Sequence, residues 1–250
     1  TLHLLENTFG RWRHEELRAW SSGRQDVVWA LEKIAVWNDL FPRAAWVLSR
    51  LALAENTSYS NNSTGILTGL FSVGPDWAAT QAPPNARFPI VERLLKSSDC
   101  DERSLGLELC KEWLRTSGGS RIVGAEYQGM RPTLQFWRPA VWGEVFDAWR
   151  MAWRFLRRET KQWPDEQRRA ALAVLISVGL PLSHFQVMAE EVVETLFEIA
   201  DDPAMDKAEF VAAVVRDLRH PLSKYPRGIR ESWLGFFGQG DKWKDCCTFP

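Results

Sequence analysis

The sequence predicts an all-α fold, an irregular α-solenoid or helical bundle whose helices form paired hairpins. Apolar residues recur at spacings of three and four along most of the 250 residues, which is the period of an amphipathic helix. No region alternates strictly between apolar and polar residues, as a half-buried strand would. Helix pairs recur roughly every 35–45 residues, the spacing of helical repeats, so about nine to ten helices are expected.

The helices expected in the first half of the chain cover 24–38, 43–55, 66–72, 88–96 and 104–115. Pro42 stands where the second of these begins, and proline suits a first helical turn because its missing N–H has no helical partner there. Ser98 or Asp99 can cap the last of these helices. Asp101 and Glu102 favour the positive end of its dipole.

The helices expected in the second half cover 141–161, 164–176, 185–200, 206–219 and 226–237. The first is the clearest, because its apolar side chains keep the helical spacing throughout. Its tryptophans Trp142, Trp149 and Trp153 follow that spacing, and such a stripe most often fills the gap between packed helices. We therefore expect all three indoles in the core.

Long loops at 56–65, 73–85 and 117–140 interrupt the helices and are expected to gather along one surface. They are rich in Ser, Asn, Thr, Gly and Pro, the residues that favour turns. The chain is expected to form one repeat-like domain over 1–240, with the 117–140 loop as the place for any subdivision. Residues 241–250 are expected to be a flexible tail or linker.

The composition is typical of a globular protein, with 45% hydrophobic and 25% charged residues. The 31 basic and 32 acidic residues give a formal net charge of -1, which indicates neither nucleic acid nor an anionic membrane as a partner. No apolar run approaches the roughly 18 residues that span a bilayer. Four cysteines are too few for a disulfide framework, which favours a cytoplasmic location. Position 1 is not Met, so the chain is expected to be an excised part of a longer protein.

The sequence contains no recognisable catalytic or metal-binding motif. The phosphate-binding pattern Gly-x4-Gly-Lys-Ser/Thr and the nucleophile elbow Gly-x-Ser-x-Gly do not occur. His3, His14, His184 and His220 stand far apart, and none has a Cys or carboxylate at a ligand spacing. We therefore expect no enzyme activity, no cofactor and no metal. An enzyme of unrecognised type would require a deep pocket with converging ionisable groups.

The 117–140 loop holds the residues that we expect to bind a partner: Glu126, Tyr127, Gln128, Arg131 and Trp137. Long loops on a rigid scaffold often carry function. The alternative is a structural plug, in which Tyr127 packs against helices and Arg131 bonds to helix-end carbonyl groups.

An arginine stripe on the expected 141–161 helix supports a second function. Arg150, Arg154, Arg157 and Arg158 lie opposite its apolar face and could follow a phosphate backbone, with Trp137 as a stacking platform. The alternative is a solvated helix face paired with neighbouring acids. A nucleic-acid-binding helical module is thus the alternative function.

Residues 88–115 resemble a HEAT-type repeat, with a helix, the turn Ser97-Ser-Asp-Cys-Asp-Glu-Arg and a second amphipathic helix. Three further segments resemble the helical region that follows the nucleotide-binding module in large bacterial STAND-type NTPases linked to antiphage defence. They are Ile34-Ala-Val-Trp-Asn-Asp-Leu-Phe-Pro-Arg-Ala-Ala, Ser60-Asn-Asn-Ser-Thr-Gly and Val123-Gly-Ala-Glu-Tyr-Gln-Gly-Met-Arg-Pro. The resemblance implies a non-enzymatic scaffold or sensor module that contacts other domains of the same protein or a protein partner, with the ATPase outside these residues.

Overall fold

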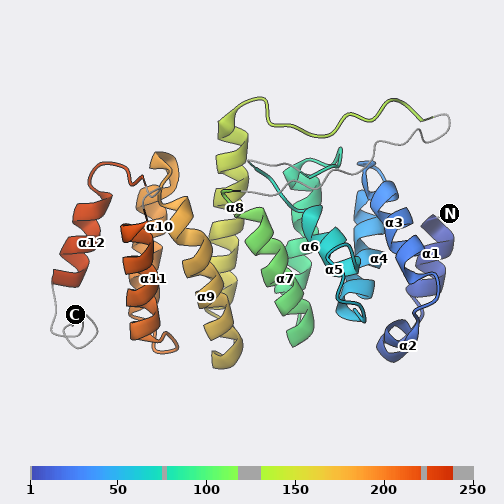
Figure 1. The fold of residues 1–250 in the computed structure, drawn as a ribbon, viewed down its shortest axis with the longest axis horizontal. Coiled ribbons are helices and arrows are strands. Elements are labelled where there is room, and N and C mark those ends of the chain that lie inside the picture. Colours follow the sequence, from blue (N-terminus) through green and yellow to red (C-terminus); the bar gives the residue numbers. More distant parts are fainter. Residues whose placement is uncertain (1, 75–77, 118–130, 221–223, 239–250) are drawn as a thin grey trace. The chain divides into compact units, whose positions relative to one another are not determined.

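The computed structural model describes residues 2–74, 78–117, 131–220 and 224–238 (Figure 1). These residues form twelve α-helices and no strand, which confirms the predicted all-α class for this part of the chain. In chain order the helices are α1 (Leu2–Phe9), α2 (His14–Ala19), α3 (Arg24–Ala35), α4 (Phe41–Leu53), α5 (Ser63–Gly69), α6 (Pro84–Leu95), α7 (Cys100–Trp113), α8 (Trp142–Thr160), α9 (Asp165–Leu182), α10 (Gln186–Ala200), α11 (Lys207–Arg219) and α12 (Ile229–Gly238). Within the described ranges, no helix is long and apolar enough to cross a membrane.

The described helices outnumber the predicted ones because α1 and α2 precede the first helix that the sequence periodicity predicts. In α1 the buried residues are Leu2 and Phe9, and in the six-residue α2 Leu17 is buried. Helices so short and so exposed carry too little apolar periodicity to be recognised in a sequence window of 11 or more residues. Both pack against α4, which supplies the tertiary contacts that short helices need.

Contacts between Cα atoms divide the chain into two compact units, Thr1–Ala152 and Trp153–Pro250. The division falls inside α8.

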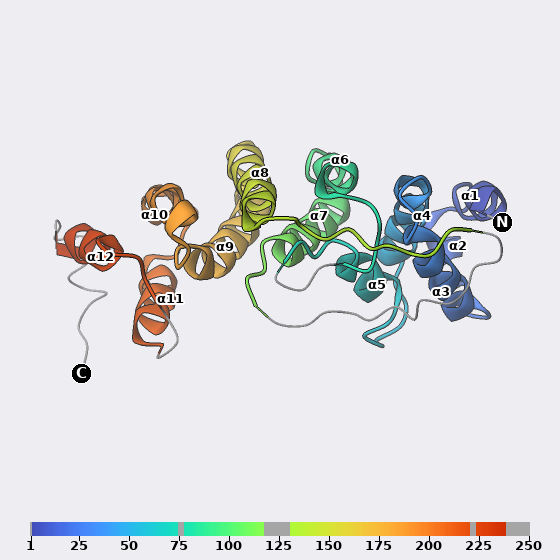
Figure 2. The ribbon, with the colours of Figure 1, turned by 90° about the horizontal axis from the view of Figure 1, so that it is seen from above.

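In the first unit α4 is the central helix, in contact with α1, α2, α3, α5, α6 and α7. Figure 2 shows α1, α4 and α6 in one row and α3, α5 and α7 in a second. Pro42 lies in the first turn of α4, as predicted. The buried face of α4 includes the small residues Ala44, Ala45 and Ala52, which let neighbouring helices approach closely.

The predicted cap between α6 and α7 is confirmed. Asp99 is the N-cap residue of α7, and its carboxylate accepts hydrogen bonds from the backbone amides of Asp101 at 2.7 Å and Glu102 at 3.2 Å. Such a cap satisfies amide groups that have no partner inside the helix.

In the second unit α9 packs against α10 and α11, and α10 packs against α12. The indole of Trp233 in α12 is fully buried in an aromatic cluster. Its ring neighbours are Phe197, Phe210, Phe236 and Phe237. The burial of this large side chain explains how the short α12 stays attached to its unit.

The predicted tryptophan stripe of α8 is confirmed for two of its members and wrong for the third. Trp149 and Trp153 are fully buried, but Trp142 is 52% exposed. Residues 141–144 are all exposed, so this first turn of α8 extends beyond the packed part of the helix. Trp142 stacks on Phe146, with ring centroids 6.0 Å apart, instead of entering the core.

Candidate functional site

Two features of the first unit are candidates for function, an extended segment and a polar pocket. The extended segment covers residues 131–140 and runs past the ends of helices of the first unit toward the start of α8 (Figures 1 and 2). At one point its backbone is fixed, because the amide of Trp137 donates to the carbonyl oxygen of Thr80 at 2.8 Å. Near its beginning, the guanidinium of Arg131 lies 4.6 Å from the ring centroid of Trp37 and 3.5 Å from the carboxylate of Asp39.

Trp137 covers a buried arginine of α6. Arg87 has no exposed surface, and its Nη1 donates to the carbonyl oxygens of Leu70 at 3.0 Å and Ser72 at 2.8 Å. Its guanidinium lies 5.4 Å from the ring centroid of Trp113 and 5.6 Å from that of Trp137. The electron-rich faces of two indoles therefore stabilise a charge that has no carboxylate partner among the described residues. Burial lowers the pKa of Arg87 to about 9, which leaves it charged at neutral pH.

The structure describes only two of the five residues predicted to bind a partner, Arg131 and Trp137. Glu126, Tyr127 and Gln128 lie outside the described residues. Arg131 and Trp137 both contact the chain itself, as in the structural-plug alternative, although Arg131 pairs with the side chains of Trp37 and Asp39.

The arginine stripe of α8 is paired with acids. Arg150 bonds to Asp147 at 2.9 Å, and Arg158 bonds to Glu159 at 3.1 Å. In the second unit Nε and Nη2 of Arg154 donate to the two carboxylate oxygens of Glu191 in α10. Arg157 donates to Glu198 of the same helix. Lys161 also lies 3.5 Å from Glu198. The four guanidinium groups thus form the acid-paired helix face that stood as the alternative to nucleic-acid binding.

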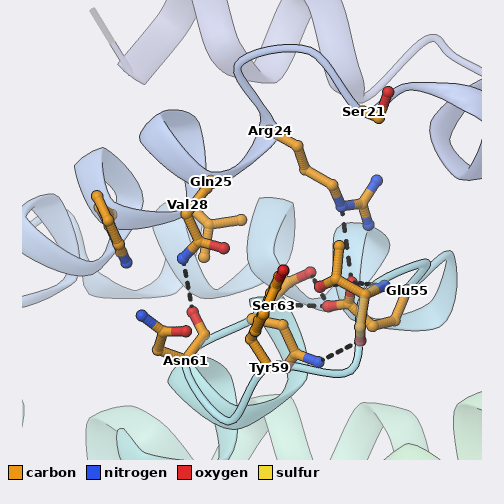
Figure 3. A pocket seen from close by; sticks show the side chains of 11 residues that line it. Ser21, Arg24, Gln25, Val28, Glu55, Tyr59, Asn61 and Ser63 are labelled. Carbon is orange, nitrogen blue, oxygen red and sulfur yellow. Dashed lines mark hydrogen bonds and ion pairs between the residues drawn. The ribbon is translucent and has the colours of Figure 1, made fainter.

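The polar pocket lies between α3, the loop that follows α4, and the start of α5 (Figure 3). Its volume of about 400 Å³ falls in the range of small-molecule sites. It is lined by Ser21, Arg24, Gln25, Val28, Trp29, Glu55, Thr57, Tyr59, Asn61, Asn62 and Ser63. Figure 3 shows the side chains of Arg24 and Gln25 reaching from α3 toward the loop that carries Glu55 and Asn61.

Glu55 fixes the loop side of the pocket. Its carboxylate accepts hydrogen bonds from the backbone amides of Asn56 at 2.9 Å, Thr57 at 3.1 Å and Ser63 at 2.8 Å. The hydroxyl groups of Thr57 and Ser63 also donate to it. Burial raises the pKa of Glu55, but the hydrogen bonds from Ser63, Thr57 and the backbone outweigh it, so the pKa lies below its ordinary value. The carboxylate therefore stays ionised and closes the loop onto the start of α5.

Arg24 fixes the opposite side. It is 3% exposed, and its two terminal nitrogens donate to the carbonyl oxygens of Leu17 at 2.7 Å, Leu51 at 2.7 Å and Ala54 at 2.9 Å. Its Nε lies 3.8 Å from Glu55 and has no hydrogen-bond partner in the described part of the chain. Burial, the larger effect, lowers the pKa of Arg24, and the charge of Glu55 raises it. The guanidinium joins the end of α4 to α2 and neutralises Glu55.

Both buried arginines stand at the start of an apolar helical stripe. Arg87 precedes Ile90 and Leu94 by three and seven positions, and Arg24 precedes Val28 by four. Because residues at these spacings share one face of a helix, an arginine in such a stripe starts on the buried face beside its neighbours. Neither arginine was among the residues predicted to be functional, and this spacing is the sequence signal that points to them.

A cavity of about 410 Å³ in the second unit lies between α9 and α11. Asp217 lines it, with its carboxylate 3.0 Å from Nε2 of His184 and bonded by the hydroxyl of Tyr225. Burial raises the pKa of Asp217, but these two partners outweigh it, so the pKa is lowered. The hydroxyl of Ser177, also on the lining, donates to a carbonyl oxygen of its own helix. The lining residues therefore offer ionisable groups without a nucleophile bonded to a base.

One group of described residues has the spacing of a metal site, Asp99, Cys100 and Asp101. All three are exposed, and Asp99 already caps α7. The cap accounts for this acidic cluster without a metal.

No family model, no curated protein and no solved structure matches this chain. The resemblances to HEAT repeats and to STAND-type NTPases therefore stay predictions.

Proposed function

We propose that this chain is a non-enzymatic scaffold that holds extended polypeptide across the ends of its helices, as an interaction module of a larger multidomain protein. The observation that carries the proposal is the 131–140 segment, which is held by Trp137 over Arg87 and by Arg131 over Trp37. One backbone hydrogen bond and two arginine–indole contacts fix an irregular segment that has no secondary structure of its own.

The way in which this surface holds its own segment suggests how it recognises other polypeptides. A backbone amide of the segment donates to a loop carbonyl oxygen, and its aromatic and basic side chains contact complementary groups of the first unit. Aromatic and arginine anchors of this kind dominate the energetics of protein interfaces. The partner is accordingly another domain of the same protein or a separate protein.

The arrangement and cellular setting belong to the same proposal. Contacts between α3 and α4, α6 and α7, and α9 and α10 support paired helical hairpins, and hence an irregular α-solenoid with HEAT-like pairs. The resemblance to STAND-type NTPases supports a scaffold or sensor segment of a cytoplasmic, bacterial antiphage defence protein. The arginines of α8 are bonded to carboxylates, so they do not favour nucleic-acid binding over the scaffold function proposed here.

The test uses Trp137→Ala, which vacates the site over Arg87 in the full chain. A labelled peptide of residues 131–141 should bind this variant and should bind the unchanged chain at least roughly tenfold more weakly, because there the site is filled intramolecularly. Fluorescence anisotropy of the peptide measures both affinities.

The matched control is Arg138→Ala, which removes an exposed side chain of the same segment. This variant should bind the peptide no better than the unchanged chain. A peptide that itself carries Trp137→Ala should bind none of the proteins. Equal binding of the two peptides to the Trp137→Ala chain would show that the segment is not held by a specific site.

A further inference from the structure

The charged groups of the pocket beside Glu55 are already paired with other groups of the protein. These two groups, Arg24 and Glu55, lie within 3.8 Å of each other, and neither is exposed at the mouth. The terminal nitrogens of Arg24 already donate to the carbonyl oxygens of Leu17, Leu51 and Ala54, and six donors already bond to the carboxylate of Glu55. A phosphate or carboxylate ligand would therefore find no available cation, and an ammonium ligand would find no available carboxylate.

The mouth of the pocket carries two aromatic side chains that the fold leaves in contact with water. Trp29 is 42% exposed and Tyr59 is 69% exposed, although both are large and apolar over most of their surface. The buried side chain of Val28 adds an apolar surface to the lining of the pocket. Such rings offer flat faces to the C–H groups of a ligand while keeping a polar tip for a hydrogen bond.

Several polar side chains of the lining are not used by the protein. The hydroxyl groups of Ser21 and Tyr59 and the side-chain amide of Asn61 make no hydrogen bond to any described residue. Gln25 donates its amide to the backbone oxygen of Asn61 at 2.8 Å, which leaves its own side-chain oxygen available as an acceptor. The pocket therefore offers a ligand neutral hydrogen-bond donors and neutral acceptors beside the faces of two aromatic rings.

The walls that carry these groups are held in place before a ligand arrives. Asn62 caps α5 by accepting from the amide of Gly65 at 2.9 Å, and its own amide donates to the carbonyl oxygen of Thr57 at 2.8 Å. Together with the bonds to Glu55, these contacts order a loop that is polar and has no helix or strand of its own. An ordered loop lowers the entropy cost of binding.

We propose that this pocket binds a neutral saccharide, with a pyranose ring stacked on Trp29 or Tyr59 and its hydroxyl groups bonded to Gln25 and Asn61. A pyranose combines an apolar C–H face with hydroxyl groups that both donate and accept, which matches a neutral pocket of amides, hydroxyls and indole or phenol faces. A purely apolar ligand would leave the amides unpaired, and a charged ligand would have no counter-charge. The proposal is independent of the 131–140 segment.

The test is direct binding of defined sugars to the full chain. The probes are the methyl glycosides of glucose, galactose and mannose, N-acetylglucosamine, cellobiose and chitobiose, with adenosine and uridine as planar neutral ligands. Saturation-transfer NMR identifies binders, and calorimetric titration gives their affinities. At least one saccharide should bind, and Trp29→Ala or Tyr59→Ala should weaken it by roughly tenfold, the value of one aromatic stacking contact.

The matched control is Trp142→Ala, which removes another half-exposed indole outside the pocket. This variant should bind the sugar as the unchanged chain does. Circular dichroism checks that the three variants, all of exposed side chains, keep their helices. Three results would overturn the proposal: no saccharide binds, the pocket variants bind as well as the unchanged chain, or the nucleosides alone bind.

Discussion

At the scale of single residues, two buried arginines are stabilised by different partners, although Nε of Arg24 and both Nε and Nη2 of Arg87 make no hydrogen bond to the described residues. Arg24 has a carboxylate 3.8 Å away and three close carbonyl oxygens. Arg87 has two carbonyl oxygens and lies between the indoles of Trp113 and Trp137. A buried charge without such partners would cost several kcal/mol. Trp137 therefore does more than anchor its own segment, because it also shields a guanidinium that has no acid partner in the described ranges.

Glu112 of α7 allows a prediction about pH. Burial raises the pKa of its carboxyl group to about 7 from the ordinary 4.5, against the opposing effects of Arg115 and Ser72. Between these two pH values the folded state keeps a proton that the unfolded state has released, so the free energy of unfolding falls as pH rises. Glu112→Gln cannot titrate and should remove this part of the pH dependence. Urea unfolding at several pH values between 4.5 and 7 measures it.

Glu108→Gln is the control for this pH experiment, because Glu108 lies on the same helix and is exposed. It should leave the pH dependence of stability as it is in the unchanged chain. If Glu112→Gln shows the same slope of stability against pH as the unchanged chain, Glu112 does not bind the proton.

At the scale of helices, the close contact of α9 with Trp153 can be tested at Gly179. A Cβ atom at this position would lie 2.8 Å from Cη2 of Trp153 and 3.2 Å from Cδ2 of Leu196. Trp153 and Leu196 are fully buried, so moving either side chain disturbs the packing around it. Gly179→Ala should therefore lower the free energy of unfolding by about 1–3 kcal/mol, as overpacked cores do. Helix propensity alone predicts the opposite sign, a gain of about 1 kcal/mol.

Gly235→Ala in α12 separates packing from propensity. Apart from the nearby backbone of α12 itself, no atom of the described residues lies within 4 Å of a Cβ built at Gly235, so this substitution should stabilise the second unit by up to about 1 kcal/mol. Chemical denaturation of the two variants beside the unchanged chain gives both changes. A gain in stability from Gly179→Ala would mean that Trp153 does not pack against α9 at this glycine.

The helices were predictable where apolar residues keep the helical spacing over many residues and where a capping residue marks an end of the helix. The expected helices at 24–38 and 43–55 agree with α3 and α4 to within a few residues, and Asp99 caps α7 as expected. The expected helix at 164–176 ended too early, because α9 continues to Leu182 through Gly179 and Pro181. Glycine and proline favour a helix end locally, but burial of the last turns of α9 outweighs that preference.

The candidate sites were much less predictable, because their contacts join residues far apart in the sequence. The loop at 56–65 was recognised as polar, but nothing local shows that Glu55 and Arg24 meet. The 117–140 loop was recognised as long, but its contact with Arg87 depends on tertiary packing. Sequence periodicity identifies which face of a helix is buried and gives no information about the partner of that face.

At the scale of the whole molecule, charge is balanced in total, and along α8 it is also balanced locally. The formal net charge is -1, and the arginines of α8 are each bonded to a carboxylate. Phosphate-backbone binding requires cations that release counterions from the nucleic acid, and an arginine that is already paired contributes little to this. The chain should therefore show no measurable binding to double-stranded DNA or single-stranded RNA at low salt, by fluorescence anisotropy of labelled oligonucleotides.

Two double variants make this prediction decisive. Glu191→Gln with Glu198→Gln removes two negative charges and frees the guanidinium groups of Arg154 and Arg157. It should produce weak binding that disappears as salt rises, because the freed arginines then act as phosphate contacts. Arg154→Glu with Arg157→Glu should not bind. If the unchanged chain itself binds at low salt and the arginine variant does not, the acid pairs open for nucleic acid, and the alternative function is the correct one.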